Sequence, residues 1–519
     1  MLEKKTLLLI AFIEGAVMVL LELVVPHLTS PFIGNSVFVW GVTISIAVGG
    51  LGIGYFAGGL FSKTQLQKEL LLMRLLYFAG LSLLLGLLII KTVSVVSFIE
   101  SLFVGCVFLL MLLLPSFLFG SIVSVSIQCL NSLAQGEKKA SVDVFAFSSA
   151  GGVLFAFIVG FYLIPIKGLV FPTSLSVAII FFLLVFLNLR LKKNKFRRWI
   201  VFYLVLFLVT AFGVHSVSPT GIDVLHYSEG LNGQIIVVDV PSTIDSSNSD
   251  RILFINRMGQ TWINKSSGES QWSYVNYVTS MASLYPPGSR SLVLGLGGGV
   301  VACQLSKFAN HFIDVAEIDQ QIIDVAVEYF DLNSTPNIKV FCEDARRYVK
   351  KSNIKYDFIL VDIFNGEIVP SHGLSIEAFQ DLKNILSPNG IVVVNFNGFE
   401  RGSVAISGKV LGNTMCAAGF NLKILPTSEP TESERNNLYI GYIKQPDWDN
   451  RRLALNVHNR PLKIDSAMHD FQKGQFLIVS DDLPLMEYIN ADAAGQWRKS
   501  YFEKWTKRLQ KVYGLDFFK

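Results

Sequence analysis

The first 217 residues of the chain alternate between long apolar runs and short polar loops. Seven runs have about the 20 apolar residues that a membrane-spanning helix needs: roughly 6–25, 37–61, 70–90, 97–119, 143–165, 169–189 and 199–217. Residues 116–130, after Pro115, fit an extension of the fourth helix past a kink, an interfacial segment or a short re-entrant piece. The pattern predicts an α-helical multi-pass membrane domain over residues 1–217, with about seven helices.

From residue 218 the apolar runs become short. Runs typical of strands at 233–240 and 251–256, followed by a helical stretch at 271–285, predict a small β-rich subdomain over residues 218–285. Strands and helices then alternate, which predicts an α/β domain over 286–519 with a parallel sheet and helices on both faces. The expected strands are 291–296, 312–318, 338–342, 356–363 and 390–395, with an antiparallel pair at 422–425 and 437–442; the expected helices are 300–309, 320–330 and 376–386.

Composition separates the same two halves. The 519 residues are 51% hydrophobic and 16% charged, with a mean hydropathy of +0.48, which excludes an ordinary water-soluble protein and a disordered one. The net charge of +4 combines +8 for residues 1–217 (15 basic, 7 acidic) with −4 for residues 218–519 (29 basic, 33 acidic). The five cysteines have no paired spacing, and no histidines have metal-ligand spacing, so neither a disulfide scaffold nor a metal site is expected.

The basic residues of the first half lie between the apolar runs, at Lys63, Lys138 and the cluster 190–198. This placement predicts membrane orientation, with these loops and the amino terminus in the cytoplasm, and gives no reason to expect nucleic acid as a partner. Seven spans would put residue 218 onward on the outer side. An extra crossing within 91–130 would return the second half to the cytoplasm but place the cluster 190–198 outside, so the side of the membrane stays open.

Glycines and carboxylates follow four successive predicted strands of the second half. The first strand runs into Gly295-Leu-Gly-Gly-Gly299, where glycines let the backbone turn and approach a ligand closely. Glu317 and Asp319 follow about 20 residues later, where a carboxylate can accept both hydroxyls of a ribose. Asp344 and Asp362 follow the third and fourth strands. Since the carboxyl ends of parallel strands meet at one edge of a sheet, the pattern predicts a nucleoside site.

These motifs resemble the spermidine/spermine synthase family, within the wider S-adenosylmethionine-dependent methyltransferase-like fold. The resemblance covers residues 220–490 and implies a Rossmann-like, mostly parallel seven-stranded sheet. Its matches are Gly230–Asp239, Asn256–Thr261, Gly295–Gly299, Glu317–Asp319, Asp344-Ala345, Tyr356–Asp362 and Ser480–Glu487. The first half is similar to the integral membrane portion found fused to such synthases, in Glu22, Pro31–Gly34, Trp40, Gly151-Gly152 and Gly160–Pro165.

The resemblance implies a transferase of polyamine biosynthesis. It would move the aminopropyl group of decarboxylated S-adenosylmethionine to a polyamine such as putrescine, with no permanently bound cofactor and a possible homodimer through the synthase-like domain. An alkylamine with a pKa of about 10 is protonated at pH 7, so the reaction needs a base, and Asp362 matches the family's base. Family matches further assign nucleoside contacts to Gln260, Gly295, Gly297, Gly299, Glu317, Asp319, Asp344 and Ala345, and the amine pocket to Tyr274 and Asn365.

The chain departs from the family at the amine side of this site. Gly298 stands where the family has an aspartate that contacts the aminopropyl amine, Asn365 replaces a second aspartate, and Val275-Asn276 replaces a His-Glu pair. Each change removes a carboxylate or polar partner for a polycation. Three alternatives therefore stay open: a different acceptor or ordinary S-adenosylmethionine, a methyltransferase on the same fold, and a polyamine transporter or sensor with a regulatory synthase-like domain.

Acidic side chains within the apolar runs are costly to expose to lipid. Glu14 and Glu22 lie eight residues apart on one predicted helix, close to one face, and are expected to face the bundle interior. Such a pair fits helix-packing contacts and also a cavity for a cationic polyamine. Gly50, Gly54 and Gly58 repeat every four residues, which predicts close packing against another helix.

Overall fold

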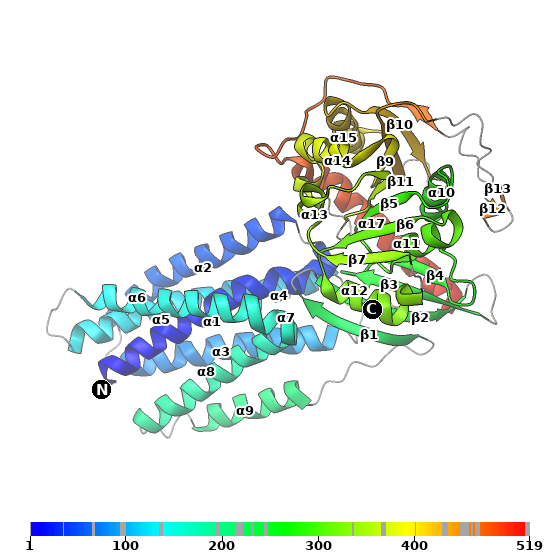
Figure 1. The fold of residues 1–519 in the computed structure, drawn as a ribbon. Helices are drawn as coiled ribbons and strands as arrows, with labels where there is room; N and C mark the ends of the chain where they lie inside the picture. Colours follow the sequence, from blue (N-terminus) through cyan, green and yellow to red (C-terminus); the bar gives the residue numbers. More distant parts are fainter. Residues whose placement is uncertain are drawn as a thin grey trace. The chain divides into compact units, whose positions relative to one another are not determined.

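The structure, a computed structural model, describes residues 2–34, 36–64, 68–93, 100–133, 139–191, 197–212, 222–230, 233–242, 248–334, 337–364, 370–399, 401–427, 434–446, 456–457, 460–461 and 468–513. The chain forms two compact units, one consisting mainly of Met1–Pro219 and the other mainly of Gln234–Leu515. The first is helical and the second contains two β-sheets with their helices (Figure 1). The domain limits at residues 217 and 285 remain predictions.

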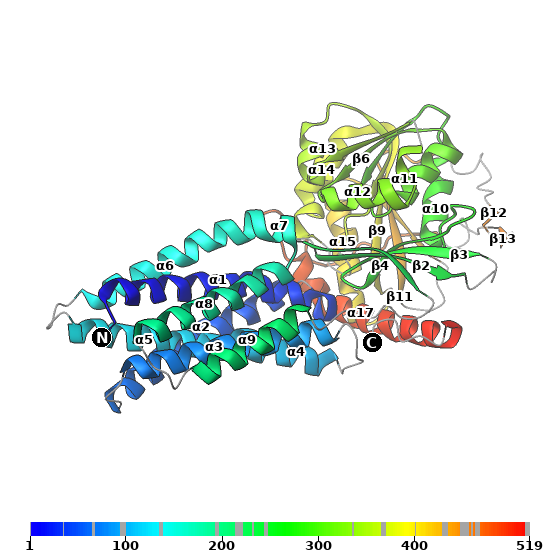
Figure 2. The same ribbon diagram turned by 90° about the horizontal axis from the view of Figure 1, so that it is seen from below.

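Long apolar helices that run alongside one another make up the first unit (Figure 2). Six helical runs in the described part of the chain are long and apolar enough to cross a membrane. The seventh predicted span corresponds to α9, whose 16 residues rise only about 24 Å, less than the ~30 Å of a bilayer core. Residues 213–217 of that predicted span lie outside the described residues. The helices are α1 (Lys4–Ile33), α2 (Val37–Thr64), α3 (Lys68–Val93), α4 (Glu100–Phe108), α5 (Leu114–Leu133), α6 (Ala140–Ile158), α7 (Ile164–Lys167), α8 (Val170–Leu191) and α9 (Arg197–Phe212).

In two of these helical runs, a π-helical turn joins two consecutive α-helices. The turn η1 (Leu109–Leu113) links α4 to α5, and η2 (Val159–Leu163) links α6 to α7. Each turn ends two residues before a proline, Pro115 or Pro165. Because proline has no backbone N–H and its ring clashes with the preceding turn, the local hydrogen-bond pattern must widen, and a π turn does this without ending the helix. The segment 116–130 therefore extends the fourth span.

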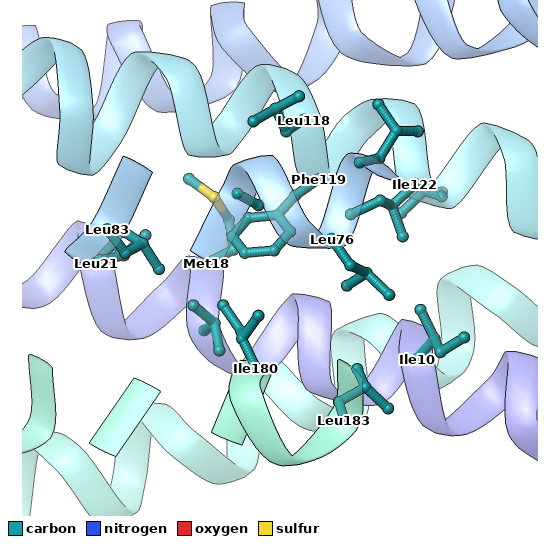
Figure 3. Packing of buried hydrophobic residues seen from close by; sticks show 14 of the residues in the cluster. Ile10, Met18, Leu21, Leu76, Leu83, Leu118, Phe119, Ile122, Ile180 and Leu183 are labelled. Atoms are coloured by element: carbon teal, nitrogen blue, oxygen red, sulfur yellow. The ribbon is translucent and has the colours of Figure 1, made fainter. Parts of the chain in front are cut away.

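The core of the first unit lies around α1. Met18 of α1 lies next to Phe119 of α5, and Leu76 of α3 and Ile180 of α8 belong to the same cluster (Figure 3). Large apolar side chains on the outer faces are exposed, among them Phe56 of α2, Phe157 of α6 and Phe182 of α8. Exposed apolar surface of this extent is typical of helices that face lipid.

Glycines set the closest approaches between helices. Gly50, Gly54 and Gly58 of α2 all face α5, and a Cβ atom at Gly54 would meet the carbonyl of Phe117. The predicted ridge is thus a packing surface, as expected for small residues in apolar helices. Gly15 of α1 has the same role against α6, where a Cβ atom would meet the backbone of residue 148.

The acidic groups of α1 differ in their surroundings. Glu14 is buried and accepts a hydrogen bond of 2.8 Å from Ser148 Oγ of α6, whereas Glu22 is half-buried. At the amino end of the same helix, Lys4 forms an ion pair of 2.7 Å with Asp143 of α6. Glu14 therefore faces another helix, as predicted, and the sharing of one cavity by Glu14 and Glu22 remains a prediction.

The second unit begins with an antiparallel sheet. Its strand order is β1-β2-β3-β4, and the β3–β4 hairpin turns at Asn256 and Arg257, both with positive φ. Arg498 of the last helix donates to the Asn256 carbonyl at 3.0 Å, so the carboxyl-terminal helix holds this turn. The strands are β1 (Asp223–Gly230), β2 (Gly233–Pro241), β3 (Ser249–Ile255) and β4 (Met258–Asn264), followed by α10 (Ser273–Ala282).

The main sheet has the order β14-β10-β11-β9-β8-β5-β6-β7. The five strands from β9 to β7 pair in parallel, and β11, β10 and β14 add antiparallel pairings. In the described residues the sheet has eight strands instead of the predicted seven, because the two-residue β14 pairs with β10. The strands are β5 (Arg290–Leu294), β6 (Phe312–Glu317), β7 (Ile338–Cys342), β8 (Tyr356–Val361), β9 (Leu386–Phe399), β10 (Asn421–Pro426), β11 (Glu434–Tyr442) and β14 (His469–Asp470).

Helices cover both faces of this sheet (Figure 1). One face packs on α10, α11 (Val300–Gln304) and α12 (Gln320–Tyr329), and the other on α13 (Ala345–Lys351), α14 (Ile376–Ile385), α15 (Ile406–Ala417) and α17 (Met486–Tyr513). The strand order reverses at β5, which lies between β6 and β8. Connections leave in opposite directions at such a switch point, and in sheets of this kind ligands bind at the carboxyl ends of the strands beside it, here β5 and β8.

We expect Gly54→Val to weaken the packing of α2 on α5, because its Cβ would overlap the Phe117 backbone. Overpacking of this kind costs about 1–3 kcal/mol and should lower the unfolding temperature of the detergent-solubilised protein. Gly49→Val is the matched control on the same helix, since nothing lies within 4 Å of its Cβ position. Equal unfolding temperatures for the two variants would contradict this packing.

Candidate functional site

The loop after β5 is shaped by glycines. Gly295, Gly297 and Gly299 have φ angles of 90°, 53° and 75°, a region that other residues adopt at a cost. A Cβ atom at Gly295 would also meet the carbonyl of Asp362, the residue that follows β8. The Asp362 N–H donates to the Leu294 carbonyl at 2.8 Å. The loop and the end of β8 are therefore in direct contact at the switch point.

Glu317, at the end of β6, is bound to the same loop. Its Oε2 atom accepts from the Leu296 N–H and its Oε1 atom from the Asp319 N–H, both at 2.9 Å. Burial raises the pKa of the Glu317 carboxyl, and these backbone donors partly offset the shift. Asp319 instead caps α12, accepting from the Gln321 N–H at 2.9 Å. The carboxylate that faces the loop is thus Glu317, and Asp319 supports the helix after it.

Asp344 and Ala345 lie at the junction of β7 and α13. Asp344 is the amino-terminal cap of α13, accepting from the Arg347 N–H at 2.9 Å. Its other oxygen is 3.4 Å from Nε2 of His372 in the short turn Ser371–Gly373. Both junction residues are half-buried. The chain after β8 thus returns to the edge of the sheet formed by the end of β7.

Asp362 has two hydrogen-bond donors, one on each carboxylate oxygen. Tyr274 Oη of α10 donates to Oδ2 at 3.0 Å, and Asn395 Nδ2 of β9 donates to Oδ1 at 2.9 Å. Burial raises the pKa of Asp362, while the bonds from Asn395 and Tyr274 lower it, with a net upward shift. Burial and the adjacent carboxylate also raise the pKa of Tyr274, so its phenol stays protonated and donates. The pair presents a proton acceptor at the carboxyl end of β8.

The glycine loop also contacts β4 of the first sheet of this unit. Thr261 Oγ1 accepts from the Gly298 N–H at 2.8 Å, and a Cβ atom at Gly298 would lie 2.8 Å from Thr261 Cγ2. The methyl group of Thr261 therefore occupies the space that a side chain at position 298 would need. Gln260, the neighbouring residue, is half-buried, and its Nε2 donates to the Met258 carbonyl at 3.4 Å.

Arg346 fixes the chain segments that border Asp344. Its guanidinium donates to Asp481 at 2.7 and 2.8 Å, to Asp381 at 3.2 Å, to the His372 carbonyl at 2.8 Å and to Ser375 Oγ at 3.1 Å. The hydrogen bonds from Arg346 are the main cause that lowers the pKa of Asp481 to about 2. Arg346 thus ties the turn after β8 and the Ser480–Glu487 segment to the start of α13.

The structure brings most of the predicted site residues to one edge of the sheet. Asp362, Tyr274, Gly295 and Glu317 are linked through direct contacts or through the glycine loop. Asn365 lies outside the described residues, and in the described residues no group of three His, Cys, Asp or Glu side chains could hold a metal ion. Sequence reasoning assigned no role to Thr261, Asn395 or Arg346, although Thr261 lies in the matched segment Asn256–Thr261 and Asn395 at a predicted strand end. A third residue, Asn436 of β11, donates to Asn395 Oδ1 at 3.0 Å and was also missed.

Comparisons with known proteins give the family. A family model described as "Spermine/spermidine synthase domain" matches residues 273–408. The chain is similar to polyamine aminopropyltransferase of Alkaliphilus metalliredigens (strain QYMF), 32% identical over 211 residues, 36% of this chain and 70% of that protein. It is also similar to polyamine aminopropyltransferase 2 of Aquifex aeolicus (strain VF5), 25% identical over 465 residues, 85% of this chain and 88% of that protein.

The chain therefore belongs to the spermine/spermidine synthase family, whose relatives are named polyamine aminopropyltransferases, a class of transferases. Against two other relatives of that name the match spans less than half of their length, 42% and 47%. The crystal structure of a probable spermidine synthase from Corynebacterium glutamicum ATCC 13032 aligns with a TM-score of 0.37 at 18% identity, covering 44% of this chain and 83% of that chain.

We expect Arg346→Met to destabilise the second unit by about 1–2 kcal/mol, since a charge-assisted bidentate pair with a partly exposed partner is lost. Arg347→Met is the matched control, because the Arg347 side chain is 70% exposed and that of Arg346 only 11%. Stability measured by tryptophan fluorescence checks both.

The same contact has a defined pH dependence. The pKa of Asp481 is depressed in the folded state, so its contribution is fully present above the unfolded value of about 3.9 and is lost as pH falls towards 2. The stability difference between the native protein and Arg346→Met should therefore shrink over that window. A difference that stays constant would contradict the assigned ion pair.

Proposed function

We propose that this protein is a membrane-bound aminopropyltransferase that moves the aminopropyl group of decarboxylated S-adenosylmethionine to a polyamine such as putrescine. The observation that carries the proposal is Asp362 at the β5/β8 switch point: its backbone adjoins the glycine loop, and its carboxylate accepts from Tyr274 and Asn395. A carboxylate whose hydrogen-bond donors, Tyr274 and Asn395, are both neutral suits a reaction in which a cationic amine must lose a proton.

The chemistry needs a base and correct alignment. The lone pair of the acceptor nitrogen forms an N–C bond to the aminopropyl carbon while the C–S bond breaks, and the neutral thioether methylthioadenosine leaves. Asp362 takes the proton that the nitrogen loses. Its negative charge also attracts the protonated acceptor and holds it in line with the sulfonium carbon. Tyr274, which donates to Asp362 from α10, borders the acceptor.

The nucleoside would bind along the edge formed by β5, β6 and β7. Glu317 already accepts two backbone N–H bonds, yet each carboxylate oxygen has a second lone pair for a ribose hydroxyl. Asp344 and Ala345, which follow β7, would contact the adenine, and Gln260 lies next to Thr261, which contacts the loop. The glycines let the backbone approach the ligand without side-chain interference.

The amine side favours an acceptor with few charges. Gly298 has no side chain, and Thr261 fills the space beside it, so a second carboxylate for a polycation is missing at that position. Ordinary S-adenosylmethionine with methyl transfer is the second candidate, because a loop without this carboxylate no longer selects for the aminopropyl amine. A regulatory polyamine transporter or sensor is the third reading.

The helical unit suggests where this chemistry takes place. If α1 to α8 supply six spans and α9, which packs on α8 through Tyr203, is too short to complete a seventh, the amino terminus, the loops near Lys63 and Lys138, the cluster 190–198 and the second unit all face the cytoplasm. This topology satisfies the positive-inside rule and gives the site access to a cytosolic nucleoside. A seventh crossing would instead place the second unit on the outer side, away from a nucleoside made in the cytosol.

Asp362→Asn should abolish product formation while leaving nucleoside binding within about twofold, because the amide keeps the shape but cannot accept a proton. Glu317→Gln should instead weaken binding of methylthioadenosine about tenfold or more, the cost of a lost charge-assisted hydrogen bond. Mass spectrometry of the product and calorimetry with methylthioadenosine measure the two effects.

Since the pKa of Asp362 is raised, activity should be lost as pH falls through a value above the usual carboxylate range.

Asp357→Asn is the control on the same strand. Asp357 lies at the amino end of β8, accepts from the Arg290 N–H at 3.0 Å, and its change should leave both measurements unaltered. Product heavier by a methyl group would support methyl transfer in place of aminopropyl transfer. Failure to bind any such nucleoside would sink the proposal.

Cys342 reports the side of the membrane, since it is exposed at the end of β7. A membrane-impermeant maleimide should label it in inside-out vesicles and leave it unlabelled in right-side-out vesicles. In the variant Cys342→Ser, any remaining label is on one of the other four cysteines. Labelling in right-side-out vesicles alone would make α9 a seventh span.

A further inference from the structure

We propose that Asn395 and Asn436 are positioning residues for Asp362: two amides in series, from β11 through β9, fix the orientation of this carboxylate towards the reacting amine. The inference deepens the proposed function and rests on it for its kinetic consequences. It assigns a task in the reaction to residues at the junction of the parallel and antiparallel parts of the sheet, β9 and β11.

The direction of this hydrogen-bond chain is determined by its end group. A carboxylate oxygen only accepts, so the Asn395 amide must turn its Nδ2 atom to Asp362 Oδ1, at 2.9 Å. The Oδ1 atom of Asn395 then accepts from Asn436 Nδ2 at 3.0 Å. In the β9–β11 register, Asn436 is opposite Asn397, two residues from Asn395. Asn436 and Asn395 are therefore diagonal neighbours on one face of the sheet, within side-chain reach.

Burial gives this chain its rigidity. Asn395 is only 3% exposed, so its amide cannot exchange protein partners for water without cost. With both ends of the amide bonded, rotation of the Asn395 side chain would break two hydrogen bonds at once. The Asp362 carboxylate, held by Asn395 at Oδ1 and by Tyr274 at Oδ2, thus has one preferred plane.

The electrostatics around Asp362 explain why the partner is an amide. Tyr274 from α10 is the ionisable group that contacts it, Asn395 from β9 is neutral, and the loop Gly295–Gly299 after β5 carries no charge. Glu317 lies on β6, beyond β5. Donation by Asn395 lowers the pKa of Asp362 against the upward shift from burial. An acid at position 395 would repel the carboxylate instead.

Three variants test the proposal kinetically. Asn395→Leu should lower kcat about tenfold or more, leave KM for the nucleoside unchanged, and move the acidic limb of the kcat/KM profile to higher pH. Asn395→Asp should move that limb further, because a second carboxylate at this position repels Asp362, although aspartate and asparagine have nearly the same shape. Asn436→Leu should shift it in the same direction by a smaller amount.

Asn421→Leu is the matched control. Asn421 lies on the neighbouring strand β10 and donates to the Ile443 carbonyl at 3.1 Å at an exposed position, so the profile should not move. A uniform loss of activity in the Asn395 variants with an unshifted acidic limb would indicate a merely structural role and overturn the proposal.

A measurement without turnover separates this proposal from the proposed function. Infrared difference spectra of the full-length protein against Asp362→Asn follow the titration of this carboxyl directly. The midpoint should rise in Asn395→Leu and in Asn436→Leu, the second serving if the first does not fold. Unchanged midpoints overturn the positioning role. A native protein that transfers no aminopropyl group contradicts only the function, and the infrared shift still decides the positioning role.

Discussion

The position of β5 between β6 and β8 is the constraint on which the second unit depends. Because the strand order reverses there, the connections after β5 and β8 leave in opposite directions, which makes the carboxyl ends of these strands the place for a ligand. The two strand ends are in such close contact that Gly295 has no room for a side chain beside the Asp362 carbonyl. The carboxylate of Asp362 is then fixed by elements that arrive from both sides, α10 from one part of the chain and β9 from another.

The sequence predicted the parallel strands of this sheet and the antiparallel pair β10–β11, and among its described strands it missed the two-residue β14. Strand β7 has the expected bounds, 338–342, because alternating apolar residues end at Cys342 before an acidic pair. Helix α15 was missed, since Gly408 and Gly412 lower helix propensity, and only the structure shows that Tyr439 and Phe471 pack against them. Asp362 and Glu317 followed from the rule of carboxyl-terminal strand ends. Asn436 could not, because its contact depends on antiparallel register between residues 41 positions apart.

In the helical unit, helix packing and helix geometry depend on atoms that two residue types lack: the Cβ atom in glycine and the backbone N–H in proline. Glycines such as Gly54 and Gly15 permit backbone contact between helices, and prolines such as Pro115 lack a donor and are preceded by π turns. Hydropathy gave the approximate limits of the six long apolar runs and of the shorter α9, but could not tell whether residues 116–130 continue a helix. That depended on local hydrogen bonding around a single proline, which has no signature in average hydropathy.

Thr261 and Gly298 bear on how this site can change over evolutionary time. A side chain introduced at position 298 would collide with the stiff, β-branched Thr261, 2.8 Å from its methyl group. Removing the Thr261 hydroxyl would leave the Gly298 N–H without its acceptor. The two positions are therefore coupled: position 298 can gain a side chain only after position 261 loses its methyl group and keeps its hydroxyl, as serine would, so sterics set the order of replacements at this site.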